Sequence, residues 1–87
     1  MDWQGLGRHR IELKRPLLVV RGSKGILACG YLNVETFNRT GEAGAIVTGV
    51  NDFEDMLRAK VTAVSNAAAS AGVTPGMTGL EAIEKLR

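Results

Sequence analysis

The single cysteine and the single histidine of this 87-residue chain are the side chains best suited to covalent or acid–base chemistry. Cys29 lies in the apolar run GILACGYLN, residues 25–33, directly before a glycine, and His9 lies near the amino end. A nucleophilic cysteine needs a nearby base, cation or helix N-terminus to form its thiolate. His9 is the only histidine that could serve as that base, and no third group is evident that would orient it.

Cys29 is better explained as a packed residue before a turn. If the strands carrying Cys29 and His9 flank a third strand, two inter-strand spacings, about 10 Å, separate them. Free cysteine is among the residue types most often buried, and it packs as a small hydrophobic side chain. Gly30 then marks a bulge or a close backbone approach where the chain leaves the strand. A small enzyme with a site between subunits, using Cys29 or His9, is the alternative.

The segment Gly76-Met-Thr-Gly79 could bind a ligand, because it precedes a predicted helix whose free backbone N–H groups can hold an anion. Gly76, Thr78 and Gly79 are therefore candidate ligand-binding residues. A phosphate-binding loop would need a lysine and a longer glycine-rich stretch, and both are missing. Thr78 and Glu81 have the spacing of a helix capping box, which explains them without a ligand.

The chain offers no recognisable ligand set for a metal. One histidine, one cysteine and scattered carboxylates lack the spacing of metal sites. Asp52, Glu54 and Asp55 fit the first turn of a helix, where carboxylates complement the helix dipole. We therefore expect no metal and no other cofactor.

Positive charge is concentrated near the amino end, although the net charge of the chain is only +2. Such an asymmetry can indicate a polyanion partner, and a polyanion-binding protein is a second alternative. Aromatic residues make up only 5% of the chain and no nucleic-acid module is visible, so we do not expect a nucleic-acid partner. The basic residues that would bind a polyanion are Arg8, Arg10, Arg15 and Arg21.

Three strands are predicted in the first third of the chain. Residues 8–13 alternate in character, which indicates a strand with one covered face. Residues 17–20 are continuously apolar, and residues 26–32 form their partner across the turn 21–25. We expect the glycines of that turn to supply positive φ angles. The three strands then form an antiparallel meander.

The remainder of the chain alternates between predicted helices and one further strand. The Phe53, Met56 and Leu57 spacing gives the second helix an apolar face. Residues 60–71 are ambiguous, because Val-Thr-Ala-Val could be a strand, but Val61, Val64 and the following alanines favour a helix. The first predicted elements are a helix at 34–39 capped by Asn33, a strand at 43–50, and a helix capped by Asn51 with Glu54 three residues on. The helix at 60–71 is ended by Gly72. The last helix begins at Thr78 and has Leu80, Ile83 and Leu86 on one side.

The order of elements predicts a single α+β domain over residues 1–87. Its sheet combines the antiparallel N-terminal meander with one further strand, and three to four helices pack on one face. Because no apolar stretch reaches the roughly 20 residues that span a bilayer, we expect no membrane partner. The amino end does not have the pattern of a signal peptide, and a lone free thiol suits a reducing compartment, so we expect the protein in the cytoplasm.

Self-association is expected to complete the small core. A chain this short buries only about two thirds of its unfolded surface, and one cysteine cannot form an internal disulfide. We expect the N-terminal strands, at about residues 7–32, to pair across subunits, because this covers open strand edges. The apolar residues expected in the oligomer interface are Trp3, Leu6 and Ile11.

Three segments resemble the YunC-like proteins of bacteria and archaea, a family of unknown function. Residues 24–34 match a Cys-Gly-x-Leu-Asp/Asn-Val signature, residues 43–50 resemble a glycine-rich middle strand, and residues 76–82 resemble a Gly-Met-Ser/Thr-Gly-x-x-Ala helix entry. The likeness runs from about Arg10 to the end and implies a compact α+β domain that forms a tetramer through its N-terminal strands. It implies no activity. Asn33 stands where the family has aspartate at least as often, so no carboxylate chemistry is implied there.

Taken together, the residues and the resemblance predict a small homo-oligomeric α+β protein without catalytic activity. It would act as an assembly unit or bind a small ligand. A ligand binder would carry an enclosed pocket lined by the glycine-rich middle strand.

Overall fold

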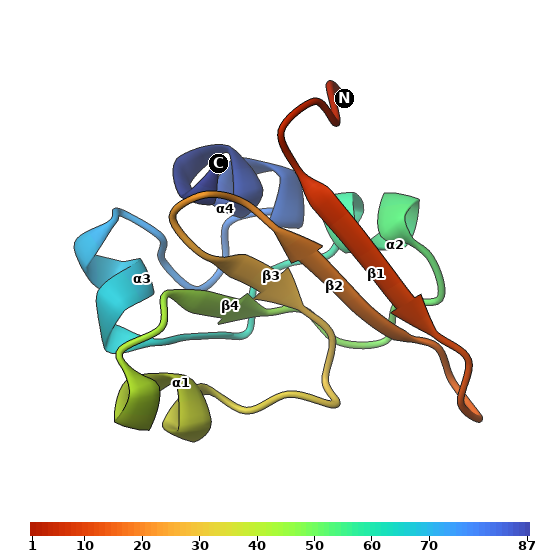
Figure 1. Ribbon diagram of the computed structural model, residues 1–87, viewed down its shortest axis with the longest axis horizontal. Coiled ribbons are helices and arrows are strands. Elements are labelled where there is room, and N and C mark those ends of the chain that lie inside the picture. The colour runs from red at the N-terminus through yellow and green to blue at the C-terminus, as the bar shows by residue number, and fades with distance from the viewer.

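The computed structural model describes all 87 residues and has an α+β fold built on one five-stranded sheet (Figure 1). The strands lie side by side in the order β1-β2-β3-β4-β5; β3 and β4 are parallel and the other neighbours antiparallel. The predicted α+β class and N-terminal meander are confirmed. The elements are β1 (Gly7–Ile11), β2 (Leu17–Arg21), β3 (Ile26–Ala28), α1 (Val34–Thr40), β4 (Gly44–Ile46), α2 (Phe53–Arg58), β5 (Ala63–Val64), α3 (Asn66–Ser70) and α4 (Gly79–Leu86).

The inner face of the sheet carries the main core. Val20, Leu27 and Ala45 lie side by side across β2, β3 and β4, and all three are fully buried. Residues of α2, α3 and α4 join the same apolar cluster, so three helices pack on this face. The buried side of α4 consists of Gly79, Ala82, Ile83 and Leu86. No helix is long and apolar enough to cross a membrane.

The outer face of the sheet is covered over only part of its width. Phe37 of α1 packs against Ala28 and Ile46, which forms a second, smaller cluster on this face. In Figure 1, α1 lies on the β4 side of the sheet, away from β1. Toward β1, the same face carries Val19, half-buried, and Ile11, which is 56% exposed. The outer face of β1 and β2 therefore carries open apolar side chains beside the exposed His9 and Arg21.

The turn between β2 and β3 is where the sequence predicts it, but its glycines have another role. Neither Gly22 nor Gly25 has the positive φ angle that we expected. A Cβ atom at Gly22 would overlap the Leu86 carbonyl oxygen. A Cβ atom at Gly25 would overlap the Ala43 carbonyl oxygen. Since the Lys24 N–H also donates to the Leu86 carbonyl at 2.9 Å, the glycines allow the hairpin to pack closely against the end of α4.

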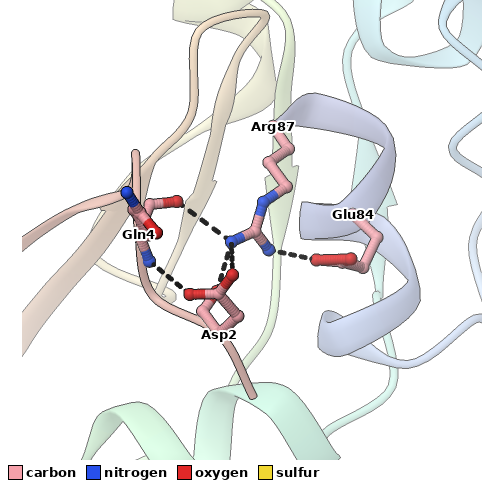
Figure 2. A network of polar contacts seen from close by, with 4 residues as sticks. All are labelled: Asp2, Gln4, Glu84 and Arg87. Carbon is pink, nitrogen blue, oxygen red and sulfur yellow. Dashed lines mark hydrogen bonds and ion pairs between the residues drawn. The ribbon is translucent and has the colours of Figure 1, made fainter.

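Arg87 ties the N-terminal segment to the end of α4 (Figure 2). Its guanidinium donates to the backbone carbonyl of Asp2 and to that of Gln4, the latter at 3.0 Å. It also pairs with Glu84, one turn back in the helix. Trp3 lies between the two carbonyls in sequence and packs at the margin of the main core. The N-terminal segment is therefore docked on the chain rather than frayed.

Most helix ends follow the sequence prediction. The Asn33 side chain caps α1 by accepting the Glu35 N–H. Thr78 and Glu81 form a complete capping box at the start of α4. Gly72 follows Ala71, the C-cap of α3, with a φ of 94°, the left-handed conformation that glycine adopts without strain.

Two details of the helices differ from the prediction. The N-cap of α2 is Asp52, whose side chain accepts the Asp55 N–H, and not Asn51 with Glu54. Asp52 is the N-cap because its carboxylate reaches the N–H of Asp55, the third residue of the helix, whereas the Asn51 N–H donates to the Asp55 side chain. Leu80 is 40% exposed rather than buried, because the side of α4 that faces the core carries Gly79 in the first turn in place of Leu80.

Residues 60–71 form a short strand and a short helix instead of one helix. The Thr62 N–H donates to the Ile46 carbonyl at 2.8 Å, and the Ser65 N–H donates to the Gly44 carbonyl at 2.9 Å. These bonds add β5 to the sheet, and Ser65 then caps α3. Sheet pairing outweighs the helical spacing of the apolar residues, which is a weak preference by comparison.

Candidate functional site

A cavity of about 250 Å³ opens at the edge of the sheet where β3 and β4 end. We expected strands over residues 26–32 and 43–50, but sheet pairing stops at Ala28 and Ile46. Because β3 and β4 are parallel, both segments continue as loops at the same edge. In open α/β sheets, ligands bind outside the carboxyl ends of the parallel strands, and β3 and β4 form one such parallel pair in this sheet. The lining residues are Arg15, Pro16, Cys29, Gly30, Tyr31, Gly49 and Val50.

Cys29 lines this cavity but is only 4% exposed. Its N–H donates to the Leu18 carbonyl at 3.1 Å, and its Sγ accepts the Leu18 N–H at 3.3 Å. The Leu32 N–H donates back to the Cys29 carbonyl at 3.1 Å and closes a turn. A Cβ atom at Gly30 would lie 3.3 Å from Thr48, so the loops after β3 and β4 lie close together. Cys29 is thus a packed residue directly before a turn.

Arg15 is the only charged residue that lines the cavity. Its Nη2 donates to the Asn51 side-chain oxygen at 3.0 Å, and Arg10 donates to the Asn51 carbonyl at 3.1 Å. Asn51 is held in turn by its own N–H, which donates to Asp55 at 3.0 Å. Since a guanidinium has five N–H donors, this arrangement orients Arg15 and leaves most of its donors free.

Backbone N–H groups without partners gather in the two loops. None of the N–H groups of Gly30, Tyr31, Thr48, Gly49 and Val50 donates a hydrogen bond within the chain. Gly49 has a φ of 72°, in the left-handed region, which lets the chain turn sharply after β4. Backbone N–H groups that converge on a concave surface can bind an anion.

His9 and Cys29 do not meet in this structure. His9 pairs with Val19, and Val19 pairs with Ala28, so β2 separates the two strands as expected. His9 also shares the outer face with Val19 and Ala28, whereas Cys29 belongs to the main core on the inner face. No group of three or more His, Cys, Asp or Glu side chains is placed to hold a metal ion.

Gly76, Thr78 and Gly79 lie at the start of α4, away from either cavity. The Thr78 hydroxyl donates to Glu81 at 3.1 Å and accepts the Glu81 N–H at 3.2 Å. Gly79 is buried, and a Cβ atom there would overlap the Met56 carbonyl oxygen. The Thr78 backbone N–H, and then its hydroxyl, hold the pKa of Glu81 below its ordinary range. These contacts account for the segment by helix capping and close packing.

The basic residues of the N-terminal region are spread over different surroundings. The Arg8 guanidinium lies over the Trp3 ring, 4.6 Å from its centroid. Arg10 pairs with Glu12. Arg15 faces the cavity of about 250 Å³, whereas Arg21 lies in a second cavity of about 410 Å³. Arg10 and Arg15 lie close together through Asn51, whereas Arg21 lies at the second cavity.

The three apolar residues expected in an interface lie on different parts of the chain. Trp3 and Leu6 are half-buried against the main core, and the Trp3 ring meets Phe53 edge-on with 6.2 Å between the ring centroids. Ile11 lies on the outer face of the sheet and is exposed. Only Ile11 therefore belongs to the open apolar surface, which continues over Val19.

The sequence alone does not locate this cavity. From the sequence, Arg15 is only part of a basic region and Tyr31 has no assigned role. A signal is present, because Gly30 directly follows an apolar segment and Gly49 follows one with only Thr48 between them. The spacing of the residues does not predict that β3 and β4 are parallel neighbours. This pairing places the two glycines at one edge of the sheet.

Two comparisons with known proteins give matches. A family model described as "Domain of unknown function (DUF1805)" matches residues 28–86, which include both loops after β3 and β4 and all of α4. The crystal structure of a protein of unknown function, TA1206 from Thermoplasma acidophilum, is 36% identical and is similar over 100% of both chains, with a TM-score of 0.82. No curated protein matches the chain.

Proposed function

The chain belongs to the DUF1805 family, whose function is unknown, and from this premise we propose that it is a homo-oligomeric, non-catalytic module that binds a small ligand in the cavity beside Cys29. The cavity is the observation that carries this proposal. It combines one oriented cation, Arg15, with unpaired backbone N–H groups and apolar side chains. Binding sites have this composition in general, a mainly apolar lining with a few placed polar groups.

The size of the cavity supports a small ligand. Sites for drug-sized molecules measure roughly 300–1,000 Å³, and this cavity, at about 250 Å³, lies below that range. A water molecule has a share of about 30 Å³ in the liquid, so the space suits a molecule with several non-hydrogen atoms. Part of the lining, Gly49 and Val50, comes from the glycine-rich middle segment, as expected for a ligand binder, but the pocket is open to solvent rather than enclosed.

The outer face of the sheet supports self-association. Ile11 and Leu13 are 56% and 50% exposed, and the neighbouring Val19 and Ile26 are only half-buried. β1 is also an edge strand, with unpaired backbone groups on one side. Such edges are usually covered or paired in native proteins. A second copy that pairs with the β1 edge and extends over the outer face of β1 and β2 would cover both features, and a tetramer is the assembly that the YunC-like resemblance implies.

We also propose relatives of this protein and the compartment in which it acts. The matched region contains most of the first segment and all of the other two on which the resemblance to YunC-like proteins rests, so we place those proteins in the same family. A buried free thiol suits a reducing compartment, and we propose that the protein acts in the cytoplasm.

A nuclear magnetic resonance screen tests ligand binding directly. ¹⁵N-labelled protein is titrated with a library of small, water-soluble acids, amines, amides and alcohols. We expect at least one compound to shift the amide signals of Gly30, Tyr31, Gly49 and Val50 together, and Tyr31→Ala to weaken that compound while the rest of the spectrum is unchanged. If no compound shifts these signals, or if all shifts map to other surfaces, the cavity is not a binding site.

The enzyme alternative makes a different prediction at Cys29. A buried thiol reacts more slowly than a free thiol, because a reagent reaches it only when the chain opens locally. We therefore expect iodoacetamide to alkylate Cys29 more slowly in the folded protein than in urea. Faster alkylation in the folded protein would favour the enzyme. Binding to heparin that weakens steeply with salt would favour the polyanion binder.

A further inference from the structure

We propose that the cavity beside Cys29 is selective for a small organic anion, an oxyanion head with a short apolar body. The head, a carboxylate or a phosphate, is bound by Arg15 and by the N–H groups of the loops after β3 and β4. The body lies against Pro16, Val50 and the ring of Tyr31. This inference rests on the proposed function and adds the chemical class of the ligand.

The charge of the lining selects an anion. Arg15 lines the cavity and no acidic side chain does. Arg10, which contacts the same Asn51, is already paired with Glu12, so the free cation at this site is Arg15. Arg15 is exposed and makes one hydrogen bond, to Asn51, so its remaining donors can form charge-assisted bonds to an oxyanion.

The backbone supplies further donors at the same place. Gly30 and Tyr31 follow β3, Gly49 and Val50 follow β4, and none of their N–H groups has a partner within the chain. Free N–H groups and a guanidinium both donate, so together they match a group that only accepts. An ionised carboxylate or phosphate is such a group, whereas a primary amide would leave one of its own donors unmatched.

The apolar part of the lining indicates that the ligand is more than an inorganic ion. Three of the seven lining residues, Pro16, Val50 and Tyr31, present apolar surface to the cavity, and Cys29 adds its weakly polar thiol. A bare phosphate would leave these surfaces in contact with water. A ligand with a short hydrocarbon or aromatic body would cover them and gain affinity from their burial.

The second cavity is a less suitable site for a small organic anion than the cavity beside Cys29. It is larger, at about 410 Å³, and it is lined by Arg21 and Lys24. However, Glu42 also lines it, and Ile26 is its only sizeable apolar side chain. Opposite charges in one lining reduce its selectivity for an anion, and an apolar body would find little surface there.

A matched series of ligands tests the inference. Acetate, propionate, butyrate, benzoate and phenyl phosphate are titrated into ¹⁵N-labelled protein at constant ionic strength, alongside the neutral butyramide and benzamide. We expect affinity to rise by about fourfold for each added CH₂ group. Benzoate should bind at least about tenfold more tightly than benzamide, because the amide loses the charge-assisted bonds. Benzoate and phenyl phosphate show whether the head is preferentially a carboxylate or a phosphate.

Two variants assign the charge to one side chain. Arg15→Gln should weaken benzoate by about tenfold or more and leave benzamide unchanged. Arg21→Gln removes a cation from the second cavity and should leave both ligands unchanged. The amide spectra of the variants away from the cavity should match those of the natural chain, which shows that the fold is retained.

The outcomes separate this inference from the proposed function. If benzamide binds in the cavity as tightly as benzoate, or if Arg15→Gln does not weaken benzoate, selectivity for anions is wrong and ligand binding stands. If benzoate shifts only the amides around Lys24 and Ile26, the anion site is the second cavity and the inference is wrong. If neither this series nor the broader library shifts the cavity amides, the proposed function fails as well.

Discussion

The backbone N–H of Leu18 in β2 donates to the Sγ of Cys29, 3.3 Å away, and the Cys29 N–H donates back to the Leu18 carbonyl at 3.1 Å. The sulfur thus extends the pairing between β2 and β3 by one residue beyond the last strand position. It also fixes the point at which the chain leaves the sheet to line the cavity. The thiol has a structural role that needs neither a base nor a metal.

Cys29→Ala should destabilise the folded chain by about 1–3 kcal/mol, since it leaves the buried Leu18 N–H without an acceptor. Urea unfolding measures the change in free energy. Hydrogen exchange gives the sharper readout, because the Leu18 amide should lose more protection than the Val20 amide in the same strand. Equal loss at both amides would mean that the sulfur does not act as an acceptor.

Gly79→Ala should be among the most damaging single substitutions, costing about 3 kcal/mol or more, because the new Cβ would overlap the backbone carbonyl of Met56. Gly76→Ala is the matched control: it has free space but a φ of 94°. Its cost should be about 1–2 kcal/mol, from the left-handed backbone alone. Thermal or urea unfolding compares the two. A smaller cost for Gly79→Ala would contradict the close packing of α4 on α2.

The capping box of α4 should make stability depend on pH. The Thr78 backbone N–H and hydroxyl lower the pKa of Glu81 below its ordinary value of 4.5. A carboxyl whose pKa is lower in the folded state stabilises that state above the unfolded value, and this contribution is lost as pH falls through the folded pKa. Glu81→Gln should therefore be less stable than the natural chain at pH 7, and the difference should vanish in strong acid. A difference that is constant across pH would contradict the role of the charge.

Self-association through the open sheet face predicts a clear difference between two lysine substitutions. Ile11→Lys places a charge on the outer face and should weaken association by about tenfold or more, because the buried isoleucine side chain contributes roughly 2 kcal/mol. Leu80→Lys changes an exposed leucine of α4 and should leave association unchanged. Sedimentation velocity of the natural chain and both variants measures this. A natural chain that stays monomeric at high concentration would refute the assembly.

Much of the fold can be predicted from local patterns. The meander follows from alternating and continuous apolar runs, and Thr78 with Glu81 marks the start of α4 by its spacing alone. These features depend on neighbours within a few residues, which the sequence contains. The sequence also locates the turn with Gly22 and Gly25, but the reason for Gly22 lies in the end of α4, more than 60 residues further along the chain, and the reason for Gly25 lies in Ala43 before β4.

The errors occur where distant contacts decide. Ser65 is fully buried: it accepts the Gly44 N–H and donates to the Glu42 carbonyl, both at 2.9 Å. These bonds prevent the helix that the alanines favour from extending back to residue 60. The cavity is not evident from the sequence for the same reason, because Tyr31 and Gly49 come together through the parallel pairing of β3 with β4, and Arg15 joins them through the pairing of β2 with β3. No local spacing specifies that pairing.

The most direct test of ligand binding in this cavity is the set of contacts between a bound ligand and the protein. Isotope-filtered nuclear Overhauser spectra of the ¹³C-labelled protein with unlabelled benzoate detect protons within about 5 Å of one another. We predict contacts from the benzoate ring to the Val50 methyl groups, the Tyr31 ring and Pro16. Contacts confined to other parts of the surface, such as Ile26 in the second cavity, would contradict the account.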